Sequence, residues 1–204
     1  MKKIVALVEG DGDIKSVSLL LKRILVQQSL SNWMPGLPRV VHSVQNLIKN
    51  VDRTISCISK DKDCHALLVL LDLDDGCPKQ VATSLSGIIR SYNLPFPVAI
   101  VLAHREYESW FLASLPSIAN KFPNLFNPGN AYAAHPAPET KRDAKGWLTS
   151  QMNRKKYIET LHQEQFTMHF DMQAASFGCR SFQRLMHAIH ELTHAPTVRG
   201  FVTP

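Results

Sequence analysis

The chain has 204 residues, of which 45% are hydrophobic and 20% are charged. This composition is typical of folded globular proteins and excludes a mainly disordered chain, and the length suffices for one large domain with a buried core. The formal net charge of +6 indicates a polyanionic partner, of which nucleic acid is the first candidate. No apolar run approaches the roughly 18 residues of a membrane-spanning helix, so we expect no membrane partner.

The cysteines give no sign of a disulfide framework or of a zinc ribbon. They contain no CxxC pair and lie at Cys57, Cys64, Cys77 and Cys179. The chain begins at Met1 and enters an apolar run with no signal-peptide pattern before it. We therefore expect reduced thiols and a cytoplasmic location.

The first half of the chain alternates short apolar runs with segments of helical periodicity. We expect strands over residues 4–8, 40–44, 67–71 and 97–102. We expect helices over residues 17–24, 47–58 and 81–89, the last with Pro78 near its start. This alternation predicts an α/β fold with a mainly parallel four-stranded sheet flanked by helices.

From about residue 116 the pattern changes, because prolines interrupt the chain and no periodicity is sustained. Residues 140–162 are strongly basic and compatible with a helix, and residues 181–194 indicate a last helix that ends before Pro196. We therefore predict an α/β core over residues 1–115. Residues 116–204 should form an irregular excursion and a basic helical extension, packed on the core in one compact unit.

Acidic residues directly follow three of the predicted strands. They are Glu9 after the first strand, Asp72, Asp74 and Asp75 after the third, and Glu106 and Glu108 after the fourth. Because the carboxyl ends of parallel strands meet at one edge of a sheet, these side chains should lie close together. The period of two along a strand puts Asp72 and Asp74 on one side, whereas Asp75 should face away, in the turn or the helix cap.

Carboxylates held this close repel one another unless a cation or a proton lies between them. Oxygen ligands of this kind suit Mg2+ or Mn2+, so the pattern predicts a divalent metal site. The alternative is that the aspartates only occupy a turn and cap the next helix, and that Glu9 only marks a helix entry.

A second metal motif stands near the end of the chain. His190, Glu191 and His194 match the HExxH pattern, which on a helix puts two imidazoles on one face for zinc and supplies a glutamate as base. No acid or histidine follows as a third ligand, and Pro196 ends the helix. A zinc hydrolase is therefore kept as an alternative to a helix end where histidines suit the dipole.

The acidic motifs also resemble a known domain. Val8-Glu9-Gly10 after the first strand and Leu71-Asp72-Leu73-Asp74 after the third resemble the Toprim domain of topoisomerases, primases and OLD-type nucleases. More narrowly, residues 71–78, 105–113 and 180–185 resemble a prokaryotic family known as domain of unknown function (DUF) 4276. Its members are Toprim-like and often neighbour ATPase genes in mobile or defence loci, and the resemblance covers most of the chain.

The resemblance implies a Toprim-like, Rossmann-like fold in which Glu9, Asp72 and Asp74 bind one or two Mg2+ or Mn2+ ions. Glu9 would also inherit the general acid or base role of the first Toprim glutamate. Asp13 fits an acidic position of OLD-like nucleases, and Glu108 lies where the narrower family has its Glu-rich helix start, suited to a second metal.

These features together predict a metal-dependent, Toprim-type endonuclease that hydrolyses phosphodiester bonds, of DNA before RNA. The family setting implies prokaryotic defence against phage or mobile elements, with an ABC- or AAA-type ATPase as partner. We expect Lys145 to be the catalytic cation. Phosphate contacts should come from Lys141, Arg142, Arg154, Lys155 and Lys156. The alternative for these basic residues is that they only form a solvated helix face. The alternative for the whole protein is a non-catalytic or conditionally active nucleic-acid-binding subunit of an ATPase complex.

Overall fold

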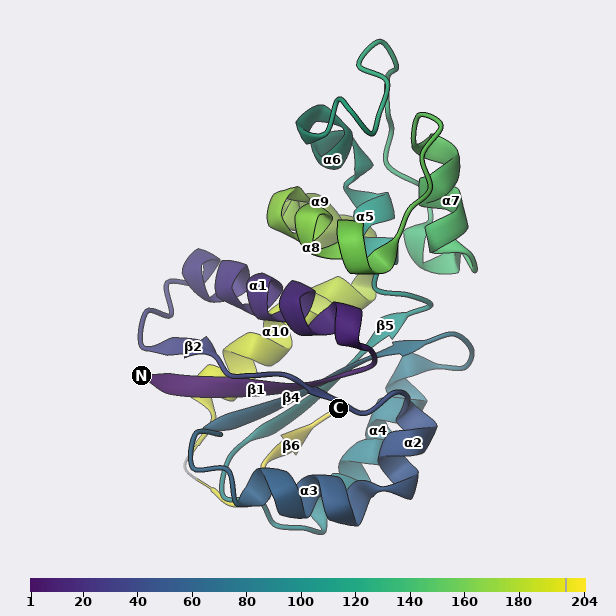
Figure 1. The fold of residues 1–204 in the computed structure, drawn as a ribbon. Coiled ribbons are helices and arrows are strands. Elements are labelled where there is room, and N and C mark those ends of the chain that lie inside the picture. Colours follow the sequence, from purple (N-terminus) through teal and green to yellow (C-terminus); the bar gives the residue numbers. More distant parts are fainter. Residues whose placement is uncertain (197) are drawn as a thin grey trace.

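A central parallel sheet with helices on both faces organises the computed structural model, which describes residues 1–196 and 198–204 (Figure 1). Its six strands are β1 (Lys2–Val8), β2 (Trp33–Pro35), β3 (Arg39–Val40), β4 (Ala66–Leu73), β5 (Val98–His104) and β6 (Val202–Thr203). The order is β2-β1-β4-β5-β6, with β3 also beside β1, and every pairing is parallel. The predicted α/β class and mainly parallel sheet are confirmed.

The predicted count of four strands is wrong, because the short β2 and β6 add to the sheet edges. The strand expected over residues 40–44 is also shorter than predicted. Only β3 pairs with β1 there, and the chain then turns at His42, whose φ of 68° is left-handed. The Ser43 hydroxyl next accepts a hydrogen bond from the Asn46 amide and so caps the following helix.

The helices divide between the two faces of the sheet and a group beyond them. Their bounds are α1 (Asp11–Gln27), α2 (Val44–Lys49), α3 (Val51–Ser59), α4 (Pro78–Arg90), α5 (Ser109–Ala113), α6 (Leu115–Lys121), α7 (Ala144–Gln151), α8 (Glu159–His169), α9 (Met172–Gly178) and α10 (Arg180–His194). Helices α1 and α10 cover one face and α2, α3 and α4 the other, while α5 to α9 gather beyond α1 (Figure 1). None of the helices in the described part of the chain is long and apolar enough to cross a membrane.

Both faces of the sheet are buried, as the continuous apolar strands require. Alternate residues of β1 divide between the two cores, since Ile4 and Ala6 belong to the core under α1 whereas Val5 and Leu7 belong to the core over α3 and α4. The core under α1 continues into α5 to α10, so residues before and after position 115 share it. The four cysteines, all within the described residues, are free.

Aromatic side chains join α5 to α10, one of the two helices that cover this face of the sheet, and to the end of α8. Trp110 and Phe111 of α5 are fully buried, and their rings lie 5.1 and 5.6 Å from those of Phe182 and Phe170, respectively. Such edge-to-face pairs contribute about 0.5–1.5 kcal/mol each beyond area burial. Arg23 of α1 adds a polar link, because its guanidinium donates to the Phe170 carbonyl at 2.9 Å and stacks on the Phe170 ring. The α5–α9 group is therefore held firmly above α1.

The basic segment over residues 140–162 is not one helix. It forms α7 and α8 with residues 152–158 between them outside any helix. Tyr157 marks the interruption, because its amide donates to the Thr149 hydroxyl at 3.1 Å and its hydroxyl donates to Glu108 at 2.9 Å. Two tertiary contacts thus compete with helix formation at this point.

Candidate functional site

The ends of β1 and β4 bring Glu9 and Asp72 together. The strands pair in register with Leu7 opposite Val69, so Glu9 follows β1 beside the last residues of β4. Glu9 Oε2 accepts a hydrogen bond from the Asp72 amide at 3.3 Å. Asp72 lies within β4 rather than beyond it, since this strand continues to Leu73. The predicted meeting of these two acids is thus found at the carboxyl edge of the sheet.

The turn after β5 brings the chain to the same point. Arg105 has a left-handed φ of 75°, which is costly for a residue other than glycine. The turn at Arg105 lets the Tyr107 amide donate to Asp72 Oδ1 at 3.0 Å. The Arg105 guanidinium also donates to the Asp74 carbonyl and, at 2.8 Å, to the Asp75 carboxylate. The strained turn therefore fixes one oxygen of Asp72.

Asp75 lies in the turn after β4, as predicted, and faces the arginines. It pairs with Arg142 at 2.7 Å as well as with Arg105, and these contacts lower the pKa of its carboxyl. Asp74 is exposed, and its charge reaches Glu9, where it contributes to a raised pKa. Asp74 is therefore at the margin of the acidic cluster, and Asp75 is outside it.

Asp13 joins the cluster from the first turn of α1. Its Oδ2 accepts from the Gly10 amide at 2.9 Å, and its Oδ1 accepts from Gln163 Nε2 of α8 at 3.0 Å. Gly12 permits this approach of α8, because a Cβ there would lie 2.8 Å from Glu159 Oε1. Helices α1 and α8 thus meet where both present carboxylates.

Glu108 is the most buried acid of the site, with no exposed surface. Its Oε1 accepts a hydrogen bond from the Tyr157 hydroxyl, whereas its Oε2 has no hydrogen-bond partner among the described residues. Burial raises the pKa of Glu108 to about 7, although Lys145 and the Tyr157 hydroxyl act in the opposite direction. A buried carboxylate oxygen without a partner is costly and is suited to a positive ligand.

Lys145, from the first turn of α7, supplies the cation within the acidic cluster. Its Nζ lies 2.6 Å from Glu159 Oε2 and 3.9 Å from Glu108 Oε2. Burial favours the neutral amine, but the charges of Glu108, Glu159 and Asp72 outweigh burial and raise the pKa of Lys145. The side chain is therefore an ammonium held between carboxylates.

The remaining acids of the cluster are harder to ionise than free carboxylates. Burial is the largest cause of the raised pKa of Glu9, Asp13 and Asp72, and neighbouring negative charges add to it. The shift is greatest for Asp72, which interacts with Glu108, Asp13 and Glu9. Each of these shifts is partly offset by Lys145. More positive charge at this point would stabilise the ionised acids.

Apart from Asp74 at the margin of the cluster, the predicted site residues divide into three groups. Glu9, Asp13, Asp72, Glu108 and Lys145 come together in the structure. Glu106 instead accepts from the Ala144 amide at 3.1 Å and so holds the start of α7. The basic side chains of Arg154, Lys155 and Lys156 are exposed on the segment that leads to Tyr157, next to the site, whereas Arg142 pairs with Asp75 and Lys141 is half-buried.

Three residues of the site were not predicted from the sequence, namely Tyr157, Glu159 and Gln163. They come from a region without a recognisable motif, and 150 residues separate Gln163 from Asp13. The one available signal is that Glu159 is an acid within a basic stretch. Its contact with Lys145 depends on the packing of α8 against α1.

No group of three or more His, Cys, Asp or Glu side chains is arranged to hold a metal ion among residues 1–196 and 198–204. The carboxylates of the cluster have oxygens engaged by protein donors, as described above for Glu9, Asp13 and Glu108. The carboxylate oxygens of the cluster are hard ligands, which suit Mg2+ or Mn2+.

The HExxH residues lie at the end of α10, away from this cluster in the fold. The exposed imidazoles of His190 and His194 stack with centroids 4.1 Å apart. Glu191 pairs with Arg184 at 2.9 Å and accepts from the Thr203 hydroxyl at 2.9 Å, which ties α10 to β6. These contacts are structural, and nothing in them favours the zinc hydrolase.

The fold and the cluster define an α/β protein with a parallel sheet and a carboxylate-rich site at the carboxyl ends of its strands. The chain belongs to the family described as Domain of unknown function (DUF4276), whose match spans residues 8–190. No curated protein and no solved structure matches the chain.

Replacing Glu108 by Gln should change how stability depends on pH. Because the pKa of Glu108 is raised from 4.5 to about 7, the native state binds this proton more tightly than the unfolded state. The carboxyl therefore destabilises the wild type as pH rises through that window, by at most about 1.4 kcal/mol per pH unit. In urea unfolding without metal, Glu108→Gln should gain stability relative to wild type between pH 4.5 and about 7.

The exposed acid Glu164 on α8 provides a matched control, since Glu164→Gln should show no such relative gain. A difference between wild type and Glu108→Gln that stays constant across the window would contradict the buried, protonatable state assigned to Glu108.

Proposed function

We propose that this protein is a metal-dependent nuclease that hydrolyses phosphodiester bonds, of DNA before RNA, at the carboxylate cluster. The observation that carries the proposal is the contact of the Glu9 carboxylate with the Asp72 amide, beside the buried Glu108 and the partly exposed Lys145 that pairs with it. An acidic pair at the ends of two adjacent parallel strands is also the pattern by which the sequence resembles Toprim nucleases, and the proposal includes that fold type. Family membership alone assigns no activity.

A divalent ion fits the donor set. Mg2+ is usually bound through one or two carboxylates and keeps several waters, so Glu9 and Asp72 suffice without a cage of three protein ligands. Asp74 and Asp13 are further oxygen ligands near this pair, since the charge of each reaches Glu9. Such an ion activates water and offsets the charge of the attacked phosphate.

The side chains supply the remaining chemistry. Glu9, whose pKa is raised by burial and by Asp13 and Asp74, is suited to accept the proton of the attacking water. The Tyr107 amide holds Asp72 in one orientation. Lys145 stabilises the negative charge that grows on the phosphate oxygens as the bond to water forms and the bond to the leaving oxygen breaks.

The exposed segment between α7 and α8 is suited to bind the nucleic-acid backbone. Arg154, Lys155 and Lys156 are all exposed there, and Tyr157 next to them contacts Glu108. Three consecutive cations thus border the cluster, where a bound strand would have to pass. Contacts of this kind give affinity without sequence preference.

A second candidate is a non-catalytic or conditionally active nucleic-acid-binding subunit that works with an ATPase. The observation that favours it is that no three acids of the described residues surround one point as a metal cage. In this case Lys145 neutralises the cluster, and a partner has to rearrange it. Binding without cleavage, with cleavage restored by the ATPase and ATP, would select this candidate.

Cleavage should depend on the two central acids. Plasmid or single-stranded DNA incubated with purified protein and Mg2+ or Mn2+ should be cut, and Glu9→Gln and Asp72→Asn should each lower the rate by at least about 100-fold. The exposed Glu164→Gln serves as the control and should cut like wild type. Equal cutting by wild type and both site variants would show contamination and reject the assignment.

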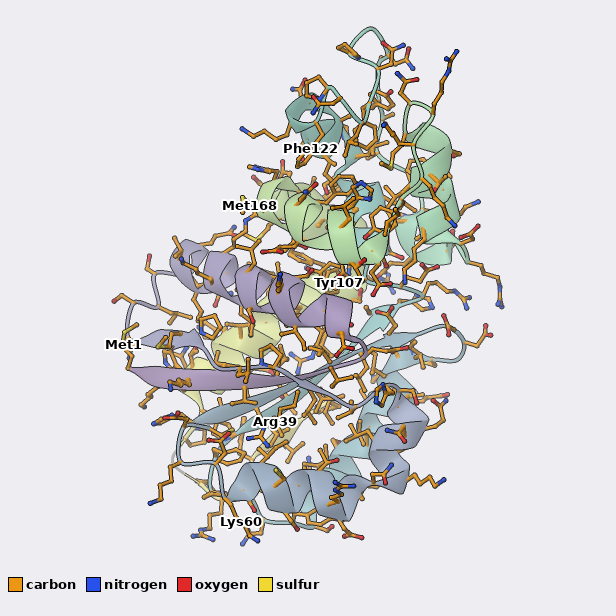
Figure 2. All side chains as sticks on the ribbon, viewed as in Figure 1. Met1, Arg39, Lys60, Tyr107, Phe122 and Met168 are labelled. Atoms are coloured by element: carbon orange, nitrogen blue, oxygen red, sulfur yellow. The ribbon has the colours of Figure 1, made fainter. Side chains whose placement is uncertain are left out.

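Binding should depend on salt and on the basic segment. Replacing Lys155 and Lys156 by Ala should weaken binding to single-stranded DNA of any sequence and reduce the slope of log K against log salt by about 0.7 for each phosphate that is no longer neutralised. Lys60→Ala is the control, because Lys60 is exposed at the opposite end of the molecule from α7 (Figure 2). An unchanged slope, measured by fluorescence anisotropy, would exclude this segment as the site that binds phosphates.

A further inference from the structure

The acidic cluster has two halves that differ in their resident charge. One half contains Glu9 and Asp72, whose carboxylates accept hydrogen bonds from backbone amides. The other half contains Glu108 and Glu159, with the Lys145 ammonium at 3.9 and 2.6 Å from their oxygens. Among the described residues, only the second half therefore holds a cation that belongs to the chain.

The second half has the features of a cation site. Glu108 is fully buried, its Oε1 is engaged by Tyr157, and its Oε2 faces Lys145 without a hydrogen bond. Glu159 is the second carboxylate beside Lys145, and its side chain has room there because Gly12 has no Cβ. Two carboxylates in such a position repel each other unless a positive charge lies between them.

Lys145 is held in this position by the fold. The amide of the preceding residue, Ala144, donates to Glu106 beyond the end of β5. The Lys145 carbonyl accepts from the Thr149 hydroxyl at 2.9 Å, and that hydroxyl in turn accepts from the Tyr157 amide. The backbone of Lys145 is thus linked through Thr149 to Tyr157, whose hydroxyl also donates to Glu108.

We propose that the Lys145 ammonium takes the place of a second divalent ion in the Glu108–Glu159 half, so that the protein binds one Mg2+ or Mn2+ ion at Glu9 and Asp72. The ion at Glu9 and Asp72 rests on the proposed function, whereas the role of Lys145 does not. A divalent ion bound by Glu108 and Glu159 would lie close to the Lys145 ammonium, and the two positive charges would repel each other strongly. Removal of the ammonium leaves two acids and the space of its side chain, which suit a hydrated divalent ion.

The test is the number of Mn2+ ions bound by the purified full chain, measured by titration calorimetry and by the electron paramagnetic resonance of free Mn2+. Wild type should bind one ion, and Lys145→Met should bind two. Lys145→Met combined with Glu108→Gln should return to one. Lys60→Met, a substitution of an exposed lysine far from α7, should bind one like wild type.

If Lys145→Met fails to fold, the Mn2+ ions bound by Lys145→Gln are counted instead. The Gln side chain is also neutral, and it keeps a hydrogen-bond donor toward Glu159. Two ions in wild type, or no additional ion in either Lys145 variant, would overturn the inference. The proposed function fails separately, if Glu9→Gln and Asp72→Asn leave the wild-type ion count unchanged. No ion in wild type and one in Lys145→Met would support the role of Lys145 while rejecting the metal at Glu9 and Asp72.

Discussion

The constraint on which the rest of the site depends is the repulsion among buried and half-buried carboxylates that lie together at one edge of the parallel sheet. Glu9 and Asp72 meet because β1 and β4 run side by side in the same direction. Glu108 joins them because the strained Arg105 turn folds the chain back after β5. Lys145 relieves this repulsion, and it comes from a helix outside the sheet. The α5–α9 group is therefore as much a part of the site as the strands.

Tyr107 connects these two parts of the molecule. Its amide holds Asp72, and its hydroxyl hydrogen-bonds with Thr167 of α8 at 2.9 Å, so it lies between α1 and the helices beyond (Figure 2). Displacement of α8 would therefore disturb Asp72 as well as Glu159. Thr167 and Gln163 are buried polar residues at this junction, where Thr167 hydrogen-bonds with Tyr107 and Gln163 donates to Asp13.

The sequence predicts the central strands and the acids that follow them, because strands buried on both faces have continuous apolar runs and their carboxyl ends share an edge. It does not predict β2 and β6, since segments of two or three residues carry no periodicity and pair only because the neighbouring strand is present. The break between α7 and α8 and the contact of Glu159 with Lys145 likewise arise from tertiary contacts. Local patterns therefore identify the acids of the site but not the helices that complete it.

The central claim, that this edge is a one-metal site with a lysine as its second cation, is tested most directly by a crystal structure of the protein grown with Mn2+. We expect a single anomalous peak between Glu9 and Asp72, with Lys145 still beside Glu108 and Glu159. A second peak beside Glu108, or no peak at Glu9 and Asp72 at saturating Mn2+, would contradict this claim.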